Sequence, residues 1–405
     1  MIDTSKPNNK IANAYASYIT DTLVGYFLGK PVVYSSANEN ALQDLQMIFE
    51  YNDEADENTE LAKNASIYGI AYERLYIDTD GNVRFKAMKP TECIPVYDDT
   101  IENNLLYFIR YYEDYDFINE EVFYGVELIT KEFVNYYRAN VTLTNLALMD
   151  EVPHYFNMVP VAIYRNNEEE VGDFERVISL IDAYDKLESD SLNDFEYFVD
   201  AYLALYGFTA EPEEIIDMKQ KRVLLMDEGT SAEWLTKNTA DAHIENMKSR
   251  LDNDIHKFSF CPNMSDENFA SNASGVSIKY KLLNTENLVS IKERKFKRGL
   301  QQRIELLAAI NALTHTSFDY REIEFTFTRN IPANTTDIAE MINKLSDVVS
   351  KETLLAQLPF IDDVQAELER IEQEKETNPF FQAGINYMTG AMSRGNEGAS
   401  DEDFE

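Results

Sequence analysis

The sequence predicts an α+β protein in which helical and strand-rich stretches follow one another along the chain. Three observations support this: apolar residues recur at helical spacing before residue 70, the period changes to two from Ala71, and long helical patterns return from residue 172. At 405 residues with 44% hydrophobic side chains, the chain is long enough to bury more than one core. We therefore expect a globular protein of two or three units.

The first 70 residues carry three helical patterns. Residues 8–30 have apolar side chains at helical spacing behind Asn9, which can cap the helix start, and Gly29 ends the pattern. Residues 39–51 and 58–69 repeat this spacing. We expect three helices here.

From Ala71 onward the chain reads as strands. Asp80 and Gly81 form the strongest hairpin signal, between two short alternating runs. Further stretches with alternating apolar and polar residues lie at 92–98, 105–112, 122–129, 132–138 and 160–164. This part is expected to be sheet.

Two long helices are predicted in the second half. Residues 172–206 have helical spacing without an internal break, as one helix or two nearly collinear ones, and a mixed segment follows to about residue 270. Residues 285–313 form the second pattern, in which Gly299 is a weak point costing about 1 kcal/mol relative to Ala. The remaining expectations are a strand at 321–330, a helix at 335–349 behind Asn334, a short turn from Ser350 to Pro359, a charged helix at 363–376 and a disordered acidic tail.

Composition limits the function. A net charge of −37 repels phosphate, so little non-specific affinity for free nucleic acid is expected, although the charge could serve solubility alone. Cys93 and Cys261 are lone cysteines, which suits a reducing compartment and no disulfide. No apolar run approaches the roughly 20 residues of a membrane span, and MIDTSKPNNK is not a secretory signal. We expect a protein that stays in the cytoplasm where it is made, without membrane partners.

None of the common catalytic patterns occurs. VGYFLGKP at 24–31 lacks phosphate-loop spacing and places Pro31 where Ser or Thr would bind magnesium. DTDGN at 78–82 is followed by Lys89 where a calcium loop needs Glu. The histidines lack zinc-ligand spacing, and no GxSxG motif is present. We therefore expect no enzymatic activity, cofactor or bound metal.

One basic stretch stands out from the acidic background. Between residues 279 and 303 there are only two glutamates but eight basic residues, namely Lys279, Lys281, Lys292, Arg294, Lys295, Lys297, Arg298 and Arg303. They could form a solvated helix face paired with acidic neighbours. Alternatively, they contact something anionic, either nucleic acid or the acidic surface of a second subunit.

The chain resembles the portal proteins of long-tailed bacteriophages, particularly those of Gram-positive hosts. The resemblance is distributed over about residues 7–376 and keeps its order. It is carried by PNNKIANAYASYITDTLVGYFLGKPV at 7–32, NASIYGIAYERLYIDTDGNVRF at 64–85, GDFERVISLIDAYDKLESD at 172–190, SGVSIKYKL at 274–282 and NIPANTTDIAEMINKLSDVVSKETLLAQLPFIDDVQAELERIEQE at 330–374.

This resemblance implies a homo-oligomeric ring of about twelve subunits at one capsid vertex, conducting double-stranded DNA during packaging and ejection. The implied partners are copies of itself, non-specifically passing DNA, the terminase large subunit, a head-tail adaptor, and the major capsid and scaffold proteins. The implied location is the virion, and the host cytoplasm during assembly. Two alternatives stay open: another oligomeric head-completion or adaptor protein without a channel, and a hydrolase or nuclease.

The family's parts map onto the chain as follows: 1–282 wing, 283–313 first stem helix, 314–333 clip, 334–349 second stem helix, 350–358 tunnel loop, and 359–405 crown-side helix with the acidic tail. The implied site residues are Lys292, Lys295, Arg298 and Arg303 in the stem, facing DNA or another subunit; Ser350, Lys351, Glu352 and Thr353 in the tunnel loop; and Phe318, Tyr320, Arg321, Phe325 and Arg329 in the clip, where terminase and adaptor would dock.

The chain departs from the family pattern at its ends. Relatives usually carry additional residues before the NNKI motif, so part of the wing is expected to be missing or supplied differently, and the crown is expected to be small. A ring of about twelve helices spaced ~10 Å apart still leaves a bore of ~28 Å, which admits duplex DNA.

Overall fold

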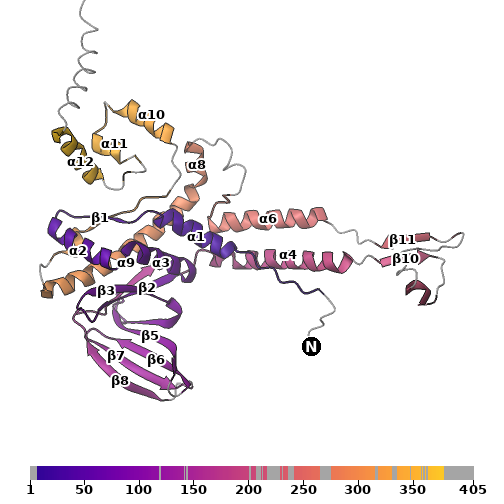
Figure 1. Cartoon of the computed structure of the whole chain (residues 1–405), viewed down its shortest axis with the longest axis horizontal. Helices are drawn as coiled ribbons and strands as arrows, with labels where there is room; N and C mark the ends of the chain where they lie inside the picture. Colours follow the sequence, from indigo (N-terminus) through magenta and orange to yellow (C-terminus); the bar gives the residue numbers. More distant parts are fainter. Residues whose placement is uncertain are drawn as a thin grey trace, which may run out of the picture.

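The computed structural model describes residues 7–117, 120–140, 142, 145–199, 202–206, 211, 213–216, 229, 231–235, 241–264, 275–314, 318–330, 335–346, 348–356, 358, 361 and 364–377. Helices, two larger sheets and one two-stranded sheet make up a body, and one helix pair extends far to one side of it (Figure 1). This mixture confirms the predicted α+β class.

Three helices and a three-stranded antiparallel sheet form the centre of the body. The sheet has the order β3-β2-β9, and Gly81 at φ 86° lies in the predicted hairpin turn between its first two strands. The predicted helices are present, although the first begins at Tyr15 rather than residue 8. The elements are α1 (Tyr15–Leu28), α2 (Glu39–Tyr51), α3 (Glu54–Tyr68), β2 (Ile70–Ile77), β3 (Val83–Met88) and β9 (Val161–Arg165).

A second, five-stranded antiparallel sheet lies below the first in Figure 1. Its strands follow chain order: β4 (Cys93–Tyr97), β5 (Leu105–Asp116), β6 (Glu121–Ile129), β7 (Phe133–Asn140) and β8 (Leu146–Pro153). A small apolar core lies between the sheets, with Tyr72 and Met88 from one and Phe108 and Ile129 from the other. All eight residues of β8 are exposed, so the sequence had no alternation there by which to predict this edge strand.

The long helix α9 (Leu283–Thr314) passes through the body and confirms the helix predicted at 285–313. It packs against β9 and α1, and Phe296, Leu300 and Ile304 on its buried face are at most 2% exposed. Gly299 lies where the ring of Tyr164 contacts this helix, and a Cβ at this position would be 2.6 Å from Cε1 of that ring. Close packing therefore explains the glycine that weakens the helix.

A buried ionic network fixes α9 to the centre of the body. Arg303 is fully buried, and its Nη2 and Nε donate to the two oxygens of Glu73 at 2.6 and 2.8 Å. Its Nη1 donates to Glu54 at 3.2 Å, and the hydroxyl of Tyr164 donates to Glu73 at 2.8 Å. Burial raises the pKa of Tyr164 well above its ordinary value, so the phenol stays protonated and donates this bond.

The remaining elements lie at the edges of the body. The segments β1 (Val33–Ser35) and β12 (Glu324–Thr326) pair with each other, which shortens the strand predicted at 321–330 to three residues. Three helices lie on the side opposite the sheets (Figure 1), and they correspond to the helical patterns predicted after residue 334: α10 (Thr335–Leu345), α11 (Lys351–Leu355) and α12 (Val364–Thr377). The predicted acidic tail and the Asn334 cap lie outside the described residues.

Candidate functional site: the projecting helix pair

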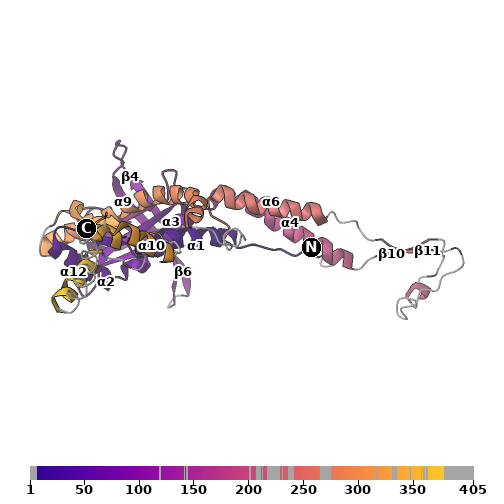
Figure 2. The ribbon, with the colours of Figure 1, turned by 90° about the horizontal axis from the view of Figure 1, so that it is seen from above.

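Two antiparallel helices form the part of the chain that projects from the body. They are α4 (Ile178–Val199) and α6 (Asp241–Ser259), which lie side by side in both views (Figures 1 and 2). The strands β10 (Tyr202–Tyr206) and β11 (Ser231–Leu235) form an antiparallel hairpin at the far end. The sequence prediction differs from the structure in two places here. The helix predicted at 172–206 ends at Val199, and α6 lies in the segment to about residue 270 that was expected to be mixed.

Side chains between the two helices hold the pair together. Lys248 of α6 lies 3.6 Å from the carboxylate of Glu188 on α4. Ile244, Leu251 and Ile255 of α6 repeat at spacings of seven and four residues, which places them on one face. This spacing was the signal by which α6 could have been predicted.

The base of the pair is anchored to α1. The hydroxyl of Tyr15 donates to Asp252 at 2.7 Å, and that of Tyr18 donates to the carbonyl of Pro262 at 3.0 Å. The ring of His256 lies edge-on to both tyrosines, and its Nδ1 lies 3.0 Å from the carbonyl oxygen of Cys261. Because these contacts come from a helix of the body, the pair is fixed in direction where it leaves the body.

The N-terminal arm, defined as residues 7–13, lies along α4. The backbone N–H groups of Asn9, Ile11 and Asn13 donate to side chains of α4 at 2.7, 2.9 and 2.9 Å, and the acceptors are Asn193, Ser189 and Asp185. Two residues of extended chain advance about 6.6 Å and four residues of helix about 6 Å, so the two spacings match. Asn9 therefore binds α4 and does not cap α1.

The projecting pair is acidic. Between Ile178 and Val199, α4 has six acidic residues and one basic residue; between Asp241 and Ser259, α6 has four acidic and three basic residues. The two helices therefore carry net charges of −5 and −1. An elongated surface of this charge repels the phosphates of DNA.

Two of the basic residues implied for DNA or subunit contact are instead buried inside the subunit. Arg303 is bound by Glu73 and Glu54 as described above, and Lys292, 4% exposed, forms an ion pair with Asp173. A buried cation is stable only beside such partners, which explains why both point inward. This corrects the expectation for Lys292 and Arg303.

The other two residues of that group lie nearer the surface of α9. Lys295 forms an ion pair with Glu168, and Arg298 is exposed. The helix α9 packs against β9 and α1 in the body, whereas α10 lies on the side opposite the sheets (Figure 1). The antiparallel, projecting geometry belongs to α4 and α6.

The segment expected to be the clip packs against the body. Phe325 on β12 is 7% exposed and contacts the ring of Tyr34, whereas Phe318 and Tyr320 pack against the main core. Arg329 donates to Glu286 at 3.0 Å and to Glu293 at 2.6 Å.

Only one of these predicted docking residues stays exposed. Arg321 lies over the ring of its neighbour Tyr320. With Phe325 buried and Arg329 ion-paired, residues 318–329 pack against the body and do not project from it.

The segment expected to be the tunnel loop forms a capped short helix. The side chain of Ser350 accepts a hydrogen bond from the backbone N–H of Thr353 at 3.3 Å, as its N-cap position predicts, and Lys351 begins α11. Glu352 accepts a hydrogen bond from Gln365 of α12 at 2.9 Å. No contact tests a role in a tunnel, so that role stays a prediction.

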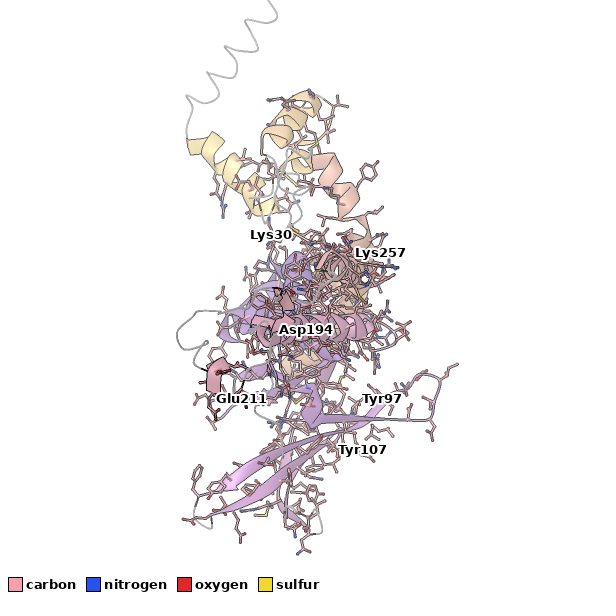
Figure 3. The ribbon with its side chains drawn as sticks, turned by 90° about the vertical axis from the view of Figure 1, so that its right-hand side faces the viewer. Lys30, Tyr97, Tyr107, Asp194, Glu211 and Lys257 are labelled. Carbon is pink, nitrogen blue, oxygen red and sulfur yellow. The ribbon has the colours of Figure 1, made fainter. Side chains whose placement is uncertain are left out.

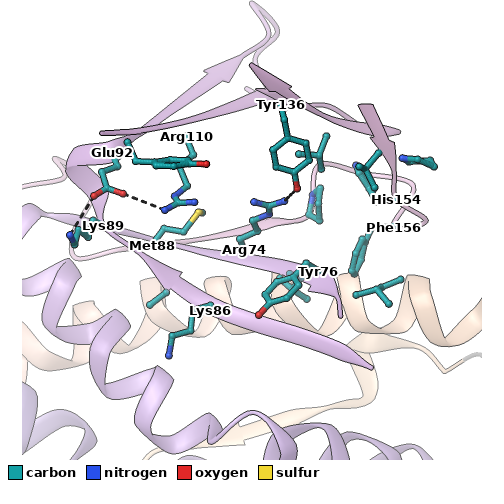
Figure 4. A pocket seen from close by; sticks show the side chains of 18 of the residues that line it. Arg74, Tyr76, Lys86, Met88, Lys89, Glu92, Arg110, Tyr136, His154 and Phe156 are labelled. Atoms are coloured by element: carbon teal, nitrogen blue, oxygen red, sulfur yellow. Dashed lines mark hydrogen bonds and ion pairs between the residues drawn. The ribbon is translucent and has the colours of Figure 1, made fainter. Parts of the chain in front are cut away.

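A cavity of about 810 Å³ lies between the two sheets (Figure 4). Its arginines already have acidic partners: Arg74 and Arg110 both pair with Glu127, and Arg110 also lies 3.6 Å from Glu92. Arg74 further donates to the hydroxyl of Tyr136 at 3.3 Å. Within the described ranges no three metal-binding side chains cluster, and no described helix is long and apolar enough to cross a membrane.

Comparisons with known proteins give one consistent result. The family described as phage portal protein, SPP1 Gp6-like, matches residues 2–379. The portal protein of Bacillus phage SPP1 is 26% identical over 398 residues, covering 92% of this chain and 78% of the relative. The portal protein of Clostridium phage phiCD119 is 24% identical over 390 residues, covering 91% and 85%.

Proposed function

Since the chain belongs to the family of SPP1 Gp6-like phage portal proteins, we propose that it closes into a ring at one capsid vertex and conducts double-stranded DNA during packaging and ejection. The observation that carries this proposal is the projecting antiparallel pair of α4 and α6 with a hairpin at its end. The family's two-helix stem, as implied by the resemblance, is thereby assigned to these helices. The clip is assigned to the β10–β11 hairpin.

The dimensions of the pair fit a channel wall. At 1.5 Å per residue, the 22 residues of α4 and the 19 of α6 give lengths of about 33 and 28 Å. About twelve helices spaced ~10 Å apart surround a bore of ~28 Å, and placing both helices of each pair side by side in the wall widens it to about 66 Å. A duplex passes through an opening of either width.

The negative charge of the helix pair favours passage of DNA over binding of DNA. Each lysine or arginine that contacts a phosphate adds salt-dependent affinity, so a strongly basic wall would hold the duplex in place. The net charges of −5 on α4 and −1 on α6 avoid this. Movement of DNA then needs an external motor, which we assign to the terminase, docking on the hairpin at the far end of the stem, where the head-tail adaptor binds later.

We assign the contacts with the capsid to the body of the subunit. In this arrangement the two sheets lie away from the stem axis and face the major capsid and scaffold proteins (Figure 1). The protein is then a component of the virion that is assembled in the host cytoplasm.

The proposal is tested by particle mass and electron microscopy of the purified full chain. We expect rings with a central hole and a mass near twelve subunits; particles without a hole would contradict the conduit. In the same experiment, replacing residues 201–240 by a short Gly/Ser linker should leave rings intact and abolish binding of the terminase large subunit. A matched insertion of Gly/Ser residues at the Asp80–Gly81 turn should retain binding. If terminase still binds rings without the hairpin, the docking assignment is wrong.

A further inference from the structure

The outer faces of the projecting pair carry charged residues on both of its sides. On α4, the outer row is defined as Asp182, Lys186 and Asp190; on α6, it is Arg250, Asn253 and Lys257. All six residues are exposed. Figure 3, viewed along the pair, labels Lys257 of the α6 row.

The two rows point away from each other. Glu188 and Lys248 mark the sides on which the helices touch. At about 100° per residue, each member of the α4 row lies roughly 120–200° around the helix from Glu188, and each member of the α6 row lies roughly 140–200° from Lys248. One side of the pair therefore presents the α4 row, and the opposite side presents the α6 row.

A closed ring of identical subunits needs this kind of asymmetry. Cyclic rings use head-to-tail contacts, in which one patch of a subunit meets a different patch of the next. We propose that the α4 outer row of one subunit pairs with the α6 outer row of its neighbour in the ring. This inference rests on the proposed portal function and names the residues by which the stems associate.

The spacing of the charges supports the pairing. Because the helices run in opposite directions and Glu188 lies level with Lys248, Arg250 lies level with Lys186 of the same subunit. In a closed ring, stems tilted from the ring axis are displaced along their own helix axes from one subunit to the next. A displacement of about 5 Å brings Arg250 level with Asp190 and Lys257 level with Asp182. The spans agree, since seven residues of α6 cover about 10.5 Å and eight residues of α4 about 12 Å.

The same shift also accommodates the remaining lysine of the α4 row. It places Lys186 level with Asn253 and Asp254, whose carboxylate is one-third exposed. The pattern negative, positive, negative of the α4 row thus meets Arg250, Asp254 and Lys257 on α6, which are positive, negative and positive. Complementary charge of this kind fixes the register between partners more than it adds affinity.

The test is a charge exchange in the full chain, read out by the mass distribution of assembled particles. Arg250→Glu and Asp190→Arg, made singly, each place like charges at every contact between subunits, and we expect at least about a tenfold rise in the protein concentration needed for rings. The double variant restores opposite charges and should form rings near the wild-type concentration. Circular dichroism checks that all variants fold.

Arg370→Glu is the matched control. Arg370 is exposed on α12 and has an acidic partner within its own helix, as Arg250 has in Asp254. Its reversal should leave ring formation unchanged. If the two single variants assemble as the control does, or if the folded double variant fails to regain rings, the pairing is wrong while the ring stands. A wild-type chain that forms no ring would refute the portal assembly itself and this inference with it.

Discussion

Gly299 lies in the middle of α9, where the ring of Tyr164 contacts the helix backbone. Helix propensity alone argues that an alanine would be better there by about 1 kcal/mol. The structure reverses this argument, because the added Cβ would have to displace a fully buried ring in the main core.

Gly299→Ala should therefore lower the free energy of unfolding by about 1–3 kcal/mol, as overpacking does. Gly25→Ala in α1 is the matched control, since a Cβ there meets nothing within 4 Å. That variant should gain up to about 1 kcal/mol from propensity. Both are measured by urea unfolding, and a stabilised Gly299→Ala protein would show that Tyr164 moves aside freely.

The basic residues of α9 show that a local sequence pattern does not predict which side chains are buried. Lys292, Arg298 and Arg303 look alike in the sequence, yet two are buried and one is exposed. Their environment depends on acidic partners supplied by distant segments, such as Glu73, which lies 230 positions before Arg303. A local pattern contains no information about such partners.

At the scale of elements, the N-terminal arm and α4 form one unit. Ser189 accepts the backbone N–H of Ile11 and donates to the carbonyl of Asp185. Ser191, two residues further on, makes only the second kind of bond, to Leu187. Comparing substitutions of the two serines therefore distinguishes the hydrogen bond to the arm from the hydrogen bond within the helix.

Ser189→Ala should loosen the arm by about 1 kcal/mol, the net value of one hydrogen bond. Amide hydrogens of residues 9–13 should then exchange about fivefold faster, whereas Ser191→Ala should leave their exchange unchanged. Mass spectrometry of peptides from this region measures both. Equal exchange in the two variants would mean that the arm is held by other contacts.

Helices and strands with regular periods could be predicted from the sequence, and the long patterns before residue 70 and at 285–313 were. The edge strand β8 could not, because an element exposed on both faces has no burial period. The pairing of α4 with α6 was missed for a different reason. A long amphipathic helix reads the same whether its apolar face meets the core or a single partner helix, and the family resemblance placed the first stem helix at 283–313.

For the whole molecule, the dominant quantity is the charge of −37 per subunit. In a ring of about twelve subunits this charge is multiplied, and the basic residues Lys292 and Arg303 are neutralised inside each subunit. The proposed ring should therefore repel free DNA.

Purified rings should consequently fail to retain free linear duplex in a filter-binding measurement at about 150 mM salt. Lowering the salt strengthens the repulsion, because screening weakens, so binding should not appear at 50 mM either. Retention with a steep inverse dependence on salt would mean that a basic, phosphate-binding surface lines the bore.

Both native cysteines lie in surroundings that suppress the reactive thiolate. Cys93 on β4 is partly buried and Cys261 beyond α6 is buried, and desolvation raises the pKa of each thiol to about 12. At neutral pH, maleimide dyes should therefore react slowly with the unmodified chain. A single cysteine introduced on the hairpin could carry a fluorophore without removal of the two native ones, so that the projecting helix pair can be followed in single molecules.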